Sequence, residues 1–234
     1  MLKVAPILML VASGLVVWLF SNWRLSRKLD QESTPLTDPI VKAHVASLAH
    51  ALELERIAVH VHEMPVLNGL AAPDGRVFVT RGFLDSYKQG KVTAEEIASV
   101  VAHELGHVAL GHARRRMIDF TGQNAIRVAL GMVLSRFIPV IGFWIANLVA
   151  GLVAARLSRQ DEFEADAYAA ALMTKAGLGT EAQKSMFAKL RRLNGRVGGA
   201  HGQPAWLMSH PRIDDRIAAI ERLERQWAKD LPTT

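Results

Sequence analysis

The sequence has no cysteine and few aromatic residues, and the absence of cysteine excludes several kinds of site. Without cysteine, no disulfide can staple the fold, and no thiolate can act as a metal ligand or a nucleophile. Aromatic residues make up 6% of the chain, whereas hydrophobic residues make up 50%. This balance fits a helix-rich protein that contacts a membrane. The length of 234 residues suits one main domain with an appendage.

Negative charge is also in short supply. Lysine and arginine number 28 against 22 aspartates and glutamates, so the net charge is +6 and the pI is about 9.9. No basic groove with interleaved aromatic residues and no known nucleic-acid reader motif accompanies this charge. We therefore expect no nucleic acid among the partners, and we interpret the basic balance as typical of a chain close to an anionic membrane.

No charged residue lies between Val4 and Phe20. As a helix, these 17 residues would span about 26 Å, at the short end of what crosses a bilayer. Trp23 follows at the depth that tryptophan favours. A cleaved signal peptide is the alternative, but no small-x-small cleavage site follows the run. The sequence predicts a single, uncleaved N-terminal membrane anchor.

Basic residues follow this anchor more often than they precede it. Arg24, Arg27 and Lys28 lie after it and only Lys3 before it, so the positive-inside rule places the main domain in the cytoplasm, at the inner cell membrane. The expected organisation is an anchor with its basic flank, a short polar linker and a main domain, over residues 1–28, 29–37 and 38–234.

The main domain alternates helices with short strands. Asp38 as N-cap, followed by Pro39, predicts one helix, and Thr93 with Glu96 forms a capping box that opens another, running to about His112. Two regions between these helices predict strands, namely Ile57–Val61 and a hairpin over Val66–Thr80. We expect an α+β fold that is predominantly helical, with a small β-hairpin or sheet.

The second predicted helix carries the run His103-Glu104-Leu105-Gly106-His107. Residues four apart lie on one helix face with Cβ atoms about 6 Å apart, so His103 and His107 can hold one zinc ion at about 2.0–2.1 Å. Glu104 then lies near the metal without having to bind it, as in a zinc hydrolase whose carboxylate handles protons. The alternative is a surface helix with two solvated histidines.

A catalytic zinc usually has three protein ligands and one open position. Because cysteine is absent, the third ligand must be a carboxylate or another histidine. A later helix, expected to begin at Ser158, carries Glu162 and Asp166 four apart on one face, whereas Asp161 and Glu164 point elsewhere. The alternative is that these acids are solvated at a helix N-terminus, which suits the helix dipole.

Three motifs together resemble the HtpX-like membrane zinc metallopeptidases, in a broader group that includes the CAAX prenyl proteases. The motifs are the His-Glu-x-x-His helix, the Ser-Arg-x-x-Glu-x-x-x-Asp run from Ser158, and Ser209-His210-Pro211 with Arg216-Ile217. The stretch from Asn68 to Leu84 also resembles the family's hairpin before the metal helix, and the resemblance covers about residues 38–222. Two features depart from the pattern: Asn68-Gly69 stands where Asn-Ala is typical, and one N-terminal span is expected where HtpX-type members usually have two.

The resemblance implies a zincin-like metallopeptidase domain that binds one zinc ion per chain. It makes Glu104 the base, and it gives the ligands as His103, His107 and Glu162. It places Asp166 beside the ligands, where it would orient a metal-bound histidine or assist proton transfer. It suggests that His210 hydrogen-bonds the substrate or its oxyanion.

The resemblance also implies protein or peptide substrates and contact with lipid. An edge strand would pair with extended substrate backbone, and the candidate contacts are Asn68, Ala71, Val77 and Val79. The implied function is that of a membrane-anchored, zinc-dependent endopeptidase in membrane protein or envelope quality control. Two alternatives stay open: a zinc-binding but catalytically latent membrane scaffold or chaperone, and a membrane interaction protein without metal.

A second apolar stretch runs from Val128 to Ala155, interrupted by Arg136. If both of its flanks return to one metal, it cannot cross the membrane an odd number of times. Two crossings would leave about 14 residues each, roughly 21 Å, which is short of the hydrocarbon core. We therefore expect a membrane-associated insertion, either a re-entrant or interfacial helical hairpin or two helices buried in protein; full spanning is the less favoured alternative.

Overall fold

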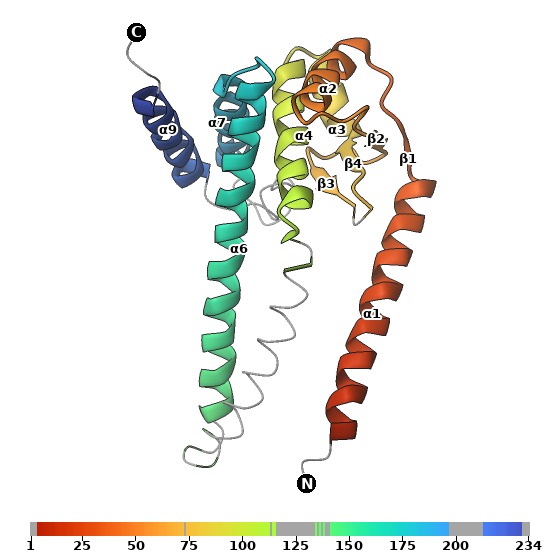
Figure 1. Ribbon diagram of the computed structural model, residues 1–234, viewed down its shortest axis with the longest axis vertical. Coiled ribbons are helices and arrows are strands. Elements are labelled where there is room, and N and C mark those ends of the chain that lie inside the picture. Colours follow the sequence, from red (N-terminus) through yellow and green to blue (C-terminus); the bar gives the residue numbers. More distant parts are fainter. Residues whose placement is uncertain are drawn as a thin grey trace. The chain divides into compact units, whose positions relative to one another are not determined.

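The computed structural model describes residues 4–72, 74–112, 114–115, 141–196 and 213–230, with isolated positions 134, 136 and 138. These residues form helices and a small sheet (Figure 1), in the order α1 (Val4–Gln31), β1 (Ser33–Pro35), α2 (Pro39–Ala51), β2 (Val59–His62), β3 (Gly69–Ala71), β4 (Val77–Thr80), α3 (Arg81–Lys88), α4 (Ala94–Ala109), α6 (Ile141–Lys175), α7 (Glu181–Arg196) and α9 (Ile213–Asp230). The chain divides into two compact units, Met1–Lys28 with Gly111–Asp161 and Leu29–Leu110 with Glu162–Thr234. A predominantly helical fold with a small sheet is confirmed.

The sheet is mixed and has the strand order β1-β2-β4-β3. Strands β2 and β4 run parallel, with Val61 opposite Val79, and the flanking strands β1 and β3 are antiparallel to their neighbours. The predicted hairpin is confirmed, because β3 and β4 pair from Gly69 opposite Val79 to Ala71 opposite Val77. Strand β2 begins two residues later than expected.

Residues 29–37 are more structured than the polar linker that their composition suggests. Helix α1 continues to Gln31, and the next residues form strand β1, which pairs with β2. Leu29 and Leu36 are both buried. A three-residue edge strand buries few side chains, so its sequence gives little apolar alternation to detect.

Capping residues fix the starts of α2 and α4. Asp38 caps α2 as predicted, because its carboxylate accepts two backbone N–H bonds of the first turn. At α4 the capping box is confirmed, with Thr93 Oγ1 accepting from the Glu96 amide at 3.2 Å and Glu96 Oε2 accepting from the Thr93 amide at 2.8 Å. The same carboxylate accepts bonds from Ser185 and Lys189, which ties α4 to α7.

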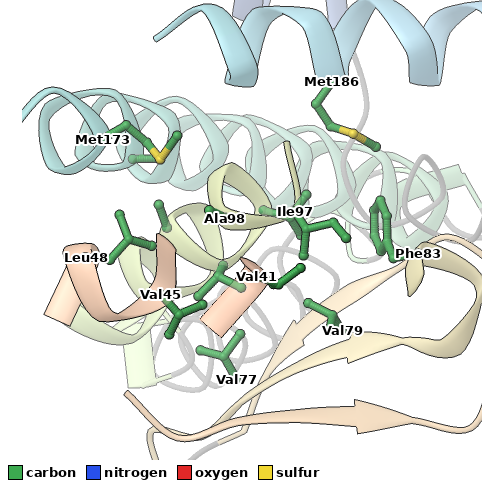
Figure 2. Close-up of a cluster of buried hydrophobic side chains, with 14 of the residues drawn as sticks. Val41, Val45, Leu48, Val77, Val79, Phe83, Ile97, Ala98, Met173 and Met186 are labelled. Atoms are coloured by element: carbon green, nitrogen blue, oxygen red, sulfur yellow. The ribbon is translucent and has the colours of Figure 1, made fainter. Parts of the chain in front are cut away.

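Helix α4 is the centre of the second unit. Thirteen of its 16 residues are buried, which is the pattern of a helix that is covered on all sides. Figure 2 shows the core that surrounds it, with side chains from α2, β4, α3, α4, α6 and α7, namely Val41, Val45, Leu48, Val77, Val79, Phe83, Ile97, Ala98, Met173 and Met186. Helix α4, which carries the two candidate histidine ligands, is therefore held in place by packing against several elements.

Helix α6 is longer than the sequence predicts. The expected start at Ser158 is wrong, since the helix runs without interruption for 35 residues from Ile141. The acidic run beyond Ser158 resembles a helix N-terminus, but the turns before it are already helical. The C-terminal end is as predicted: Gly177 has φ +75°, and the Leu178 amide donates to the Met173 carbonyl at 2.9 Å, which is the long bond of a Schellman motif.

Large apolar side chains are exposed in the first unit. On α1 they include Leu15, Val16, Leu19, Phe20 and Trp23, and on α6 they include Trp144, Leu148 and Leu152. In the described part of the Val128–Ala155 segment Ala146 is buried, but most large apolar side chains are exposed; most of the stretch before α6 lies outside the described residues. Among the residues that the structure describes, none of the helices combines the length and the apolar character needed to cross a bilayer.

Candidate metal centre

Two imidazole nitrogens and one carboxylate converge between α4 and α6. The Nε2 atoms of His103 and His107 lie 3.2 Å apart. Glu162 Oε2 lies 3.5 Å from the His103 nitrogen, and Glu162 Oε1 lies 3.5 Å from the His107 nitrogen. All three side chains are buried. Asp161, one residue before Glu162, takes no part in this group and accepts a bond from Arg115 at 3.2 Å instead.

The separation of the two histidine nitrogens fits a tetrahedral metal. Bonds of about 2.0–2.1 Å to zinc produce distances of about 3.3–3.4 Å between neighbouring ligand atoms. The two imidazole nitrogens lie 3.2 Å apart, close to that value, and each has a different oxygen of the Glu162 carboxylate 3.5 Å away. Two histidines and one carboxylate are also a donor set that catalytic zinc sites use, with a fourth position left open. These residues fit a zinc ion.

A close approach of two helix backbones brings Glu162 within reach of the histidines. A Cβ atom added at Gly106 would lie only 3.0 Å from both the Cα and the carbonyl oxygen of Ala165. Glycine and alanine at this crossing allow α4 and α6 to touch along their backbones. Glu162 lies one turn before Ala165, so its short side chain meets the face of α4 that carries the two histidines.

Asp166 contacts the Nδ1 atom of His103, and Arg216 in turn binds Asp166. His103 Nδ1 lies 2.9 Å from Asp166 Oδ1, and Arg216 donates two bonds of 2.6 Å to the same carboxylate. The short contact assigns a proton to Nδ1, because the ionised Asp166 carboxylate can only accept a hydrogen bond. When the ring is neutral, this tautomer has its lone pair on Nε2, the atom that lies beside His107 and Glu162.

The charges of this group shift two pKa values. Burial alone would lower the pKa of His103, but the bonds to Asp166 and Glu162 outweigh burial and raise it to about 9. Burial would raise the pKa of Asp166, but the Arg216 charge and hydrogen bonds, with those of His103, hold it below its usual value. Asp166 and Glu162 together favour the protonated form of the His103 ring.

Arg216 is the residue of this site whose role the sequence did not predict. It is 1% exposed, and its guanidinium lies 4.4 Å above the ring of Phe187 on α7. A signal was present, since Arg216 shares the apolar face of α9 with Ile213 and Ile220, three and four residues away. A charged residue on a buried stripe needs a buried partner, and Asp166 is that partner.

The carboxylate of Glu104 lies against strand β3. Glu104 is buried, and a Cβ atom added at Gly69 would lie 3.1 Å from its Oε1 and 2.7 Å from a methyl of Val100. Glycine at position 69 therefore lets this end of β3 come close to the carboxylate. This contact gives a physical reason for Asn68-Gly69, where the family typically has Asn-Ala.

The candidate substrate contacts separate into two groups. The prediction that Val77 and Val79 lie on an edge strand is wrong, because β4 pairs with β2 on one side and with β3 on the other. Both side chains are also fully buried. Asn68 and Ala71 lie just before and at the end of β3, the last strand in the sheet order. His210 lies outside the described residues.

Comparison with known proteins agrees with this geometry. The family described as Peptidase family M48 matches residues 35–224, which is most of the chain. The chain belongs to peptidase family M48. The expected resemblance to HtpX-like metallopeptidases is thus confirmed, and relatives of this M48 chain include proteins named Protease HtpX.

Three relatives illustrate the range of similarity to this M48 chain. Metalloprotease LoiP of Escherichia coli (strain K12) is 32% identical over 155 residues, which cover 65% of the chain and 60% of LoiP. Metalloendopeptidase OMA1, mitochondrial, of Homo sapiens is 27% identical, over 73% of the chain and 33% of OMA1. Protease HtpX of Thioalkalivibrio sulfidiphilus is 28% identical, over 67% of the chain and 60% of that protease. The chain thus spans from one third to three fifths of the length of these relatives.

Proposed function

We propose that this M48 chain is a membrane-associated, zinc-dependent endopeptidase that hydrolyses peptide bonds of protein substrates. The observation that carries the proposal is the convergence of the buried His103, His107 and Glu162 side chains, whose ligand atoms could hold one metal ion, with the buried Glu104 on the helix of the two histidines. The names of the relatives, which are metalloprotease, metalloendopeptidase and protease, support the same reaction.

The metal that suits this site is zinc, held by His103, His107 and Glu162. Zinc in such a site supplies Lewis acidity toward a carbonyl group and lowers the pKa of water toward about 7. Asp166 fixes the His103 ring through the Nδ1–H bond, and Arg216 fixes Asp166. The ligand geometry therefore depends on α9 as well as on the two helices that carry the ligands.

Proton transfer falls to Glu104. Its carboxylate accepts a proton from the attacking water as a general base and then donates it to the leaving amine as a general acid. His210 is proposed, from its place in the Ser209-His210-Pro211 motif, to donate a hydrogen bond to the carbonyl oxygen as that oxygen gains negative charge.

The substrate backbone is proposed to extend along β3. Among the described strands, β3 pairs only with β4, so its other side can accept an extended segment by strand addition. The close packing of Gly69 against Glu104 would bring a segment on this strand near the carboxylate. Residues Asn68 to Ala71 are the proposed contacts.

Membrane attachment is proposed for the first unit, through the apolar run Val4–Phe20 as the anchor. Exposed apolar side chains on α1 and on the first part of α6 support contact with lipid. Together with the flanking basic residues, they are consistent with a main domain in the cytoplasm and a role in membrane protein or envelope quality control. One relative, in Vibrio cholerae, is named a putative beta-barrel assembly-enhancing protease.

The test is the substitution Glu104→Gln in the full chain. The amide cannot accept the proton, so we expect cleavage of an unfolded casein-type substrate to fall by about 10²–10⁴-fold while zinc content stays unchanged. Glu95→Gln, at a partly buried position in the first turn of the same helix, is the matched control and should cleave normally. Wild-type cleavage by Glu104→Gln would refute the role, and absence of chelator-sensitive cleavage by the wild type would favour a latent scaffold.

A further inference from the structure

The second unit contains a cavity that is separate from the metal centre. Its volume is about 320 Å³, at the lower end of the range of small-molecule sites. It lies between α2 and the segment that leads into β2, and none of the residues of the metal centre lines it. Its apolar lining consists of Leu36, Val45, Ala46, Ala49, Leu54, Ile57 and Val59.

Basic side chains surround this apolar lining without neutralising partners. Lys42, His50 and Arg56 line the cavity together with one acid, Glu55. Within the part of the chain that the structure describes, none of these four side chains forms an ion pair or a side-chain hydrogen bond. Arg76 differs, since it pairs with two carboxylates. The cavity therefore combines an apolar interior with positive charge that is free to meet an anion.

This combination selects among classes of ligand. A neutral apolar molecule would leave the basic groups unused, and a cationic one would be repelled by them. No phenylalanine, tyrosine or tryptophan lines the cavity, so a nucleotide would lack the large aromatic platform on which bases usually stack. An alkyl chain with an anionic head group matches both the apolar interior and the basic residues.

We propose that this cavity binds a single-chain anionic amphiphile, with its alkyl chain against the face of α2 and its carboxylate or phosphate head beside Lys42 and Arg56. Leu36, Val45 and Val59 belong both to the lining and to the hydrophobic core, so an occupied cavity would add apolar contacts beside α2 and the start of β2. The proposal concerns a site distinct from the peptidase centre and does not depend on the peptidase activity.

The segment after α2 is shaped to form one wall. Glu53 has φ +59°, a left-handed conformation that residues other than glycine rarely adopt. This turn reverses the chain directly after the helix, and the Leu54 amide bonds back to the Ala49 carbonyl at 3.0 Å. Leu54 remains about half exposed at the cavity, where an apolar side chain would gain from contact with an alkyl chain.

The test uses the full chain in nanodiscs of zwitterionic lipid with a photoreactive fatty acid that carries a diazirine on its alkyl chain. A probe of equal length with an alcohol head is the matched control. We expect cross-links within residues 42–59, and about tenfold more of them with the carboxylate than with the alcohol, as loss of a charge-assisted bond implies. Equal labelling by the two probes would overturn the proposal.

Two variants locate the ligand within the cavity. Lys42→Gln with Arg56→Gln should reduce carboxylate labelling to the alcohol level, and Ala46→Trp should fill the space and abolish labelling. Lys88→Gln with Lys91→Gln, at exposed positions away from the cavity, is the control and should label normally. Circular dichroism verifies that each variant is folded, and undiminished labelling of folded Ala46→Trp would contradict the proposed location.

Competition identifies the source of the amphiphile. If anionic phospholipid added to the nanodisc suppresses labelling, a bilayer lipid supplies the head group; if labelling persists and unlabelled laurate suppresses it, a free fatty acid is the ligand. Both results support the site. A short apolar peptide with a free C-terminal carboxylate that displaces the probe at lower concentration than laurate would overturn the assignment in favour of a peptide.

Discussion

In α6, apolar side chains are exposed in the first part of the helix, whereas charged side chains are buried farther along. Near its start, Trp144 and Leu152 are apolar and yet 76% and 62% exposed. Farther along the same helix, Glu162 and Asp166 are charged and yet no more than 3% exposed. Both parts contradict the simple rule that apolar residues are inside and charged residues are outside.

The difference shows that a side chain is buried where the fold provides a suitable contact for it, and not by its polarity alone. Glu162 meets two imidazoles, and Asp166 meets His103 and Arg216, so the cost of removing each charge from water is offset by specific contacts. The exposed apolar residues near the start of α6 have no such cover within the described part of the chain, as is common for surfaces that meet lipid or another protein.

The largest effect on stability should come from Arg216→Ala. The substitution leaves Asp166 as a buried carboxylate without its bidentate cation, which should lower the free energy of unfolding by about 3–5 kcal/mol. Zinc affinity should also fall by about 10–100-fold, since His103 loses its orienting group. Arg222→Ala, at an exposed position of α9, is the control for urea unfolding and zinc titration. Equal stability of the two variants would show that burial of Asp166 does not depend on its partner.

The second largest effect should be the change in stability of the metal-free protein with pH. The pKa of His103 is raised to about 9 in the folded state, so its stabilising contribution is complete below pH 6.5 and is lost as the pH rises through about 9. The pKa of Asp166 is lowered, so its contribution is present above its ordinary value and is lost in acid. Urea unfolding of chelator-treated protein should therefore show stability falling from pH 6.5 to 9, by less than about 1.4 kcal/mol per pH unit for one group.

Zinc-loaded protein provides the control for this measurement. Bound metal replaces the proton between His103 and Glu162, so stability should change less over the same pH range. An increase in the stability of metal-free protein from pH 6.5 to 9 would contradict the charge arrangement around His103.

The parts of the site that follow local spacing could be predicted from the sequence. His103, His107 and Glu104 are neighbours on one predicted helix, and Thr93 with Glu96 marks its start. The end of α6 at Gly177 was predicted for the same reason, because capping depends on a few adjacent residues.

The parts that depend on how elements meet in space could not be predicted from spacing. The internal position of β4 follows from the parallel pairing with β2, which excludes Val77 and Val79 as edge residues. The place of Arg216 on the apolar face of α9 indicates that it needs a buried partner, but no local pattern shows that α9 packs beside Asp166. The approach of Gly106 to Ala165 is of the same kind, because a glycine inside a helix does not indicate which element it will contact.

Gly106→Ala should have the third largest effect and tests the helix crossing directly. The new methyl would lie 3.0 Å from backbone atoms of Ala165, which cannot rotate away, so the helices must separate at a cost of about 1–3 kcal/mol. Gly151→Ala is the matched control in the exposed part of α6, where a Cβ meets no atom of the described chain within 4 Å. It should instead stabilise by up to about 1 kcal/mol through helix propensity. Thermal unfolding that ranks the two variants equally would remove the close approach as the reason for glycine.

The smallest effect should come from Leu152→Gln, in the exposed part of α6. Its side chain is 62% exposed, so unfolding in mild detergent should change by no more than about 0.5 kcal/mol. Leu172→Gln, in the buried part of the same helix, makes the same chemical change and should cost more than about 2 kcal/mol, because it removes core packing and buries an amide. For binding to lipid vesicles we expect the opposite ranking of the two variants. Leu152→Gln should weaken binding, whereas Leu172→Gln, if folded, should leave it unchanged. Unchanged vesicle binding by Leu152→Gln would mean that the exposed leucine does not contact lipid, and the apolar surface of α6 would then belong to an interface with another protein.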